Sequence, residues 1–133
     1  MAQESLISIP STRSAAELIS RLEAALAAKG VTVFARIDHG AGAAAVGLPL
    51  RPTIVLIFGN PAAGTPLMQA EQTIGLDLPL KILAWEDESG TGWLSYHEPV
   101  WLAACHGIDP AAQPSLAAMT KLLHALATEA AEG

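Results

Sequence analysis

The sequence is short of the residues on which several classes of protein depend. It contains 1 Cys, 7 Lys and Arg against 13 Asp and Glu, and only 6 aromatic residues. A single cysteine can neither form an intramolecular disulfide nor supply the several thiolates of a structural zinc site. An acidic chain without a Lys/Arg cluster is poorly suited to nucleic acid, because binding there depends on neutralising phosphates. No run of 18 apolar residues occurs, which argues against a transmembrane helix.

What the chain does contain predicts one folded unit. Its 133 residues predict a single domain over 1–133. Hydrophobic residues make up 51% and charged residues 15%, which excludes intrinsic disorder, although 26 of the residues are alanine. The N-terminus, Met1 to Glu4, lacks the basic and apolar regions of a secretory signal. We therefore expect a soluble cytoplasmic protein that has no membrane or nucleic-acid partner and needs no cofactor.

Hydrophobic periodicity predicts an α+β fold. Ser14 and Glu17 have the spacing of a capping box, and the apolar face that follows predicts a helix ending at Gly30. Short apolar segments predict strands at 6–9 and 53–58, and apolar alternation predicts strands at 31–37, 80–85 and 93–96. Three- or four-residue spacing of apolar residues predicts a C-terminal helix. We expect the strand at 53–58 to be central and covered on both faces, and 40–47 to be a mobile loop or an irregular edge. The order is strand, helix, four strands and helix, in a mostly antiparallel sheet with helices packed on one face.

Several segments together resemble a known family. The sequence from about Ser14 to His106 resembles domain-of-unknown-function family 302 in five stretches: Val33–His39, Leu56–Pro61, Gly64–Met68, Asp77–Lys81 and Ser95–Tyr96. The resemblance implies small bacterial and archaeal proteins with a strand, a helix, four strands and a C-terminal helix, in a saddle-like arrangement. It implies no activity and no catalytic residue.

The best candidate for a ligand site is the loop after the third strand. The segment from Gly59 to Thr65 imitates a phosphate-binding loop, but it lacks the lysine that such loops use to bind a nucleotide triphosphate. Thr65 before Pro66 instead predicts a helix N-cap with proline at the first position. The free amides of that helix start could bind a carboxylate or one phosphate, and the alternative is a simple capped turn.

Other residues with chemical potential are scattered along the chain. Asp38 and His39 end the second strand, where a carboxylate beside an imidazole could serve a site or simply begin a turn. Cys105 is predicted to be buried and inert, and the histidines lack the spacing of metal ligands, so no metal site is predicted. The tryptophans could line an apolar pocket or pack in the core or at a subunit interface, and Trp85 and Trp93 are expected to pair across a hairpin. The candidate ligand-binding residues are Asp38, His39, Asn60, Thr65, Met68 and Tyr96.

These observations favour one functional hypothesis over two others. We predict a non-catalytic small-ligand-binding or interaction domain that acts as a homodimer, because a mean hydropathy of +0.38 in so small a domain favours burial between two copies. Its ligand would be small and anionic or apolar. The first alternative is a small acid/base enzyme that uses His39 or His106 on an anionic substrate held at the Thr65 helix start. The second is a metal- or stress-handling protein.

Overall fold

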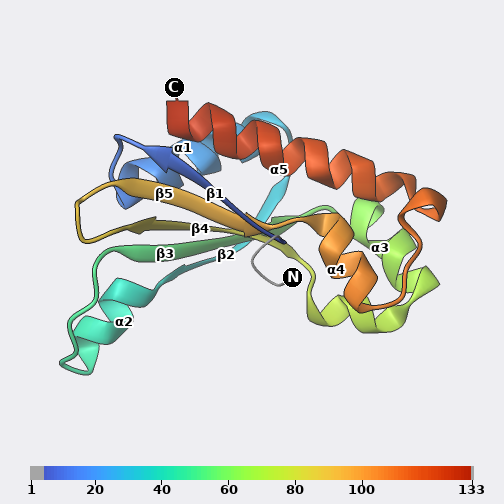
Figure 1. Ribbon diagram of the computed structural model, residues 1–133, viewed down its shortest axis with the longest axis horizontal. Helices are drawn as coiled ribbons and strands as arrows, with labels where there is room; N and C mark the ends of the chain where they lie inside the picture. The colour runs from blue at the N-terminus through green and yellow to red at the C-terminus, as the bar shows by residue number, and fades with distance from the viewer. Residues whose placement is uncertain (1–4, 133) are drawn as a thin grey trace.

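A five-stranded antiparallel sheet with helices on one face forms the core of the molecule (Figure 1). The computed structural model describes residues 5–132. The strand order is β1-β5-β4-β3-β2, and every neighbouring pair is antiparallel. The strands are β1 (Leu6–Ser11), β2 (Thr32–Asp38), β3 (Thr53–Gly59), β4 (Leu80–Glu86) and β5 (Gly92–His97). The predicted α+β class and element order are confirmed.

Two long helices cover one face of the sheet. The first, α1 (Ala15–Ala28), begins at the predicted cap, where the Ser14 hydroxyl accepts from the Glu17 N–H at 3.2 Å. The second, α5 (Pro114–Glu132), buries the predicted C-terminal stripe. Alternate residues of the strands meet these helices, since side chains alternate across a strand. The core contains Leu18, Leu22, Leu26, Ile54, Leu56, Phe58, Ile82, Leu94, Leu116, Leu123 and Leu126.

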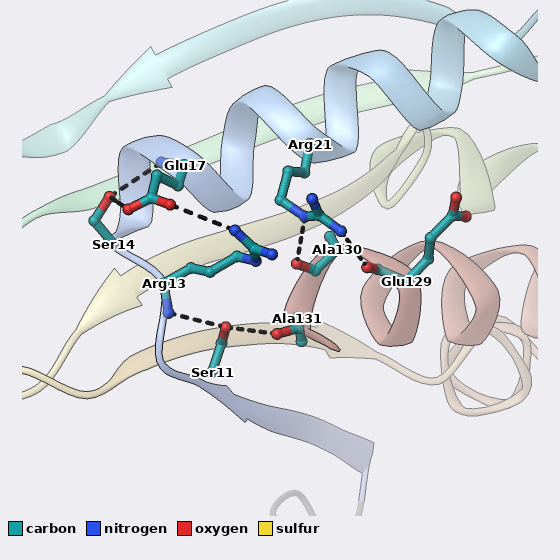
Figure 2. Close-up of polar contacts among 8 residues, drawn as sticks. All are labelled: Ser11, Arg13, Ser14, Glu17, Arg21, Glu129, Ala130 and Ala131. Carbon is teal, nitrogen blue, oxygen red and sulfur yellow. Dashed lines mark hydrogen bonds and ion pairs between the residues drawn. The ribbon is translucent and has the colours of Figure 1, made fainter. Parts of the chain in front are cut away.

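The end of α5 is tied to α1 and β1 by polar contacts (Figure 2). The Arg21 guanidinium donates to the carbonyl oxygens of Glu129 and Ala130, each at 3.0 Å. The Ser11 hydroxyl donates to the Ala131 carbonyl oxygen at 2.7 Å. The last carbonyls of a helix have no partner within the helix, so these bonds satisfy groups that would otherwise be unpaired. They fix the C-terminal helix against the first strand and the first helix.

The opposite face of the sheet is less covered than the sequence predicts. On β3, Val55 and Ile57 point to this face and are only half-buried. β3 is an interior strand between β4 and β2, as predicted, but the prediction that it is covered on both faces is wrong, because the two long helices lie on one side only. The predicted pair of tryptophans does form, since Trp85 and Trp93 stack with ring centroids 5.8 Å apart.

Both tryptophans of this pair also have polar partners. The Trp85 indole N–H donates to the Ser95 hydroxyl and the Trp93 indole N–H donates to the Asp87 carboxylate, each at 2.9 Å. The hydrogen bond from Trp93 lowers the pKa of the Asp87 carboxyl below its ordinary value. The open face therefore combines apolar surface with fixed polar groups.

Two expectations about local structure are wrong. The predicted mobile loop at 40–47 contains the helix α2 (His39–Ala45), whose alanines favour helix and whose first turn is capped by the Asp38 carboxylate, which accepts from Ala41 N–H at 2.8 Å. Cys105, predicted to be buried, is exposed at the end of α4 (Pro99–Cys105). In both cases the sequence did not reveal how little of the element packs against the rest of the protein: α2 has no buried residue, and the end of α4 leaves Cys105 exposed.

Candidate functional site

A cavity of about 230 Å³ opens at the end of the sheet where β3 ends and β4 begins. Its walls come from that edge of the sheet, from α3 (Pro61–Ala70), from the 3-10 helix η2 (Gln72–Leu76) and from α5. The lining is mainly apolar: Val31, Phe34, Ala63, Met68, Leu78, Leu80, Met119 and Leu122. Asn60 and Thr65 are the polar side chains among its lining residues. The cavity suits a small, mostly apolar ligand with few polar groups.

The helix beside the cavity starts earlier than the sequence predicts. Asn60 is the N-cap of α3, and its side-chain oxygen accepts from Ala62 N–H at 2.9 Å. Pro61 occupies the first helical turn, while Pro66 lies inside the helix. The prediction that Thr65 caps this helix is therefore wrong, because an asparagine followed by proline provides the same start signal five residues upstream. Thr65 instead contributes to the wall of the cavity.

The structure brings together three of the six candidate ligand-binding residues. Asn60, Thr65 and Met68 line the same cavity. Asp38 and His39 lie at the opposite end of the sheet, because Thr32 pairs with Gly59 whereas Asp38 pairs with Ile54. Six residues of strand separate these positions by about 20 Å. Figure 1 shows the corresponding separation of α2 from α3.

The sixth candidate, Tyr96, belongs to the core. Its side chain is 4% exposed and lies on the helix-covered face of β5. Burial raises the pKa of the Tyr96 hydroxyl above its ordinary value, and the negative charge of Glu98 raises it further. The six candidate residues consequently do not form a single ligand site.

A second polar cluster lies where α4 meets η2. His106 follows α4, and its Nε2 lies 2.5 Å from Oδ2 of Asp77. Its Nδ1 lies 2.9 Å from Oγ1 of Thr73. Thr73 Oγ1 also lies 3.3 Å from Oε1 of Glu71. A histidine is thus held between a carboxylate and a hydroxyl.

Sequence reasoning considered His106 without finding its partners. Asp77 lies 29 positions and Thr73 33 positions upstream of it, so no local spacing could indicate the cluster. His39, the other histidine considered for acid/base chemistry, is an exposed residue at the start of α2. Within residues 5–132, no three His, Cys, Asp or Glu side chains converge in a way that could hold a metal ion.

The architecture defines the class of fold: an open antiparallel sheet with its helices layered on one side. A known crystal structure shares it, that of an uncharacterized conserved DUF302 protein from Bacillus stearothermophilus. The two chains are 23% identical and align with a TM-score of 0.83 over 95% of this chain and 98% of that one. The family model "Domain of unknown function DUF302" matches residues 7–126. The chain belongs to the DUF302 family.

Curated relatives carry a more specific name. This chain is 49% identical over 114 residues to "Fluoride-specific ion channel FluC 1" of Brucella suis, a match that covers 86% of this chain and 45% of the relative. The same identity relates it to "Fluoride-specific ion channel FluC 1" of Brucella abortus, of which 42% is covered. The chain thus spans less than half the length of these relatives. Among residues 5–132, no helix has the length and apolar character needed to cross a membrane.

Proposed function

We propose that this chain is a binding domain that holds a small, mainly apolar molecule in the cavity beside α3 and acts as a homodimer. The observation that carries the proposal is the cavity itself, which is lined by residues from three strands, two helices and η2. Three residues singled out from the sequence, Asn60, Thr65 and Met68, are among its lining.

The size and lining of the cavity define the class of ligand. A volume of about 230 Å³ lies below the roughly 300–1,000 Å³ usual for drug-sized ligands, so the ligand is small or inserts only one group. Met68 and Met119 line it, and flexible thioether side chains adapt to ligands of different shape. None of the lining residues carries a charge, which favours an apolar ligand over the anionic one.

The cavity can be tested with hexan-1-ol as a probe and with neighbouring alanines of α3. Ala63 lines the cavity, whereas Ala62 beside it is exposed and does not. At ten times its Kd, a ligand stabilises the folded state by about 1.4 kcal/mol, which corresponds to about 5 °C in Tm. We expect hexan-1-ol to raise the Tm of the wild-type protein and of Ala62→Phe, but not of Ala63→Phe. Equal shifts in both variants would place binding elsewhere.

The dimer is proposed to form along the β2 edge of the sheet. Nine large hydrophobic side chains are exposed among the described residues, and six of them lie in β2 or directly after α2: Val33, Phe34, Ile37, Val46, Leu48 and Leu50. β2 is an edge strand, so one side of its backbone has free hydrogen-bonding groups. The other edge, β1, contains Pro10, which lacks an N–H. A second copy of β2 would cover the exposed apolar side chains and also pair with the free backbone groups of this edge. Both are met by one interface, because a twofold axis pairs the same surface of the two copies.

Light scattering tests this interface directly. The double substitution Ile37→Glu and Leu48→Glu places charges on the proposed surface and should halve the measured mass. Leu76→Glu is the matched control, since Leu76 is even more exposed but lies in η2, outside the proposed surface. A wild-type protein that is monomeric, or a Leu76 variant that dissociates equally, would contradict the proposal.

The relatives suggest where such a domain works. Proteins named as fluoride channels must cross a membrane. This chain spans less than half of their length, and among residues 5–132 it has no helix that could cross a membrane. We infer that the domain acts beside a membrane channel and does not itself conduct the ion. The thermal-shift experiment therefore includes sodium fluoride against equimolar sodium chloride, where equal Tm values are expected because no cation lines the cavity. A fluoride-specific rise in Tm would overturn this inference.

A further inference from the structure

The cluster at His106 has the connectivity of a nucleophilic site. An ionised carboxylate can only accept hydrogen bonds, so Asp77 requires the hydrogen of His106 to be on Nε2. The neutral imidazole then has its lone pair on Nδ1, which faces the Thr73 hydroxyl at 2.9 Å. His106 is therefore placed as a base for the Thr73 hydroxyl, and the Asp77 carboxylate orients the His106 ring.

The accessibility of the Thr73 and His106 side chains fits the roles of nucleophile and base. Thr73 is exposed, so a substrate can reach its hydroxyl. The His106 side chain is only 11% exposed, which shields the imidazole from solvent. Glu71 is a second acceptor for the Thr73 hydroxyl at 3.3 Å, and the imidazole nitrogen is the nearer of the two.

We propose that Thr73, His106 and Asp77 hydrolyse small carboxylic esters or thioesters. Thr73 Oγ1 attacks the acyl carbon while its proton passes to Nδ1 of His106. The bond from the acyl carbon to the leaving oxygen or sulfur breaks, and the leaving group takes the proton from Nδ1. Water then attacks the acyl-threonine and gives a proton to Nδ1, which returns it to Oγ1 as the acid departs. The net reaction consumes one ester and one water and yields one acid and one alcohol or thiol.

The neighbouring cavity indicates an apolar acyl group, a part of the inference that rests on the proposed binding function. Gly75 in η2 and Leu78, two residues beyond its end, both line the cavity. Thr73 lies two residues before Gly75, which places their Cα atoms within about 7 Å. An ester held at Thr73 can thus extend its acyl chain toward the cavity.

The test uses p-nitrophenyl butyrate and follows release of nitrophenolate. General-base assistance contributes about 10²–10⁴-fold to a rate, so we expect Thr73→Ala and His106→Gln to lower kcat/KM by about 100-fold. Thr73→Ser should retain the activity, because serine keeps the hydroxyl. His124→Gln is the control for hydrolysis by surface imidazoles, since His124 is exposed on α5. Acid-quenched wild-type protein should carry a butyryl group on Thr73 by mass spectrometry.

The outcomes separate this activity from the binding function. Thr73→Ala should lose hydrolysis while its Tm still rises with hexan-1-ol. Asp77→Asn should lower kcat and also move the His106 hydrogen between ring nitrogens, which ¹⁵N NMR reports and a merely structural role would not require. Wild-type rates in Thr73→Ala, or equal losses in the His106 and His124 variants, would overturn the proposal. An Ala63→Phe variant that loses hexan-1-ol binding but keeps Thr73-dependent hydrolysis would remove only the acyl-chain assignment.

Discussion

Phe58→Ala is expected to lower the free energy of unfolding by about 3–5 kcal/mol, the usual cost of deleting a buried aromatic ring. The Phe58 side chain is fully buried on the helix-covered face of β3. It pairs across the sheet with Leu80 of β4 and with Val33 of β2, so its loss leaves a cavity bordered by two strands. Urea denaturation followed by tryptophan fluorescence measures the change.

The other phenylalanine provides the control. Phe34 lies in the edge strand β2, is 52% exposed and borders the ligand cavity. Phe34→Ala should change stability far less than Phe58→Ala, but it should weaken hexan-1-ol binding. Similar losses of stability in the two variants would contradict the burial of Phe58 and the exposure of Phe34.

The parts of the fold that the sequence predicts well are those with local signals. The Ser14–Glu17 cap, the apolar stripe of the C-terminal helix and the pairing of Trp85 with Trp93 each depend on residues close in sequence. Periodicity of 3.6 or 2 residues then identifies the helix or strand between such signals. The α+β class followed from these elements alone.

The parts that the sequence did not reveal depend on which elements become neighbours. Asn60-Pro61 and Thr65-Pro66 offer equivalent start signals for a helix, and only the path of the chain after β3 selects the first. Similarly, residues 39–45 form a helix although few of their side chains pack on anything. Local propensity and capping override a composition that usually indicates a loop.

The candidate site shows the same division between local and distant information. Asn60, Thr65 and Met68 line one cavity because they belong to one loop and helix. Asp38 and Tyr96 were added on chemical grounds, and the antiparallel register separates Asp38 from the cavity while the pleat directs Tyr96 into the core. The His106 cluster joins residues about thirty positions apart, so it emerges only when α4 packs near η2.

Gly92→Ala is expected to destabilise the protein by about 3 kcal/mol or more, at the upper end of the cost of overpacking. An ideal Cβ at Gly92 would lie 2.1 Å from the carbonyl oxygen of Arg13 and 3.3 Å from Cδ1 of Leu18. The first of these contacts is with backbone, so the segment between β1 and α1 would have to move. That segment carries the Ser14 cap and the start of α1.

Gly42→Ala separates this steric effect from the general effect of replacing a glycine. Apart from its chain neighbours and the backbone of its own helix, no atom lies within 4 Å of a Cβ added at Gly42, which is inside the exposed helix α2. Alanine there should cause no loss, and it gains up to about 1 kcal/mol of helix propensity. Urea midpoints of the two variants, compared with the wild type, should therefore move in opposite directions. If Gly92→Ala retained the wild-type midpoint, the close approach of β5 to Arg13 would not exist in solution, and the position of α1 on the sheet would have to be revised.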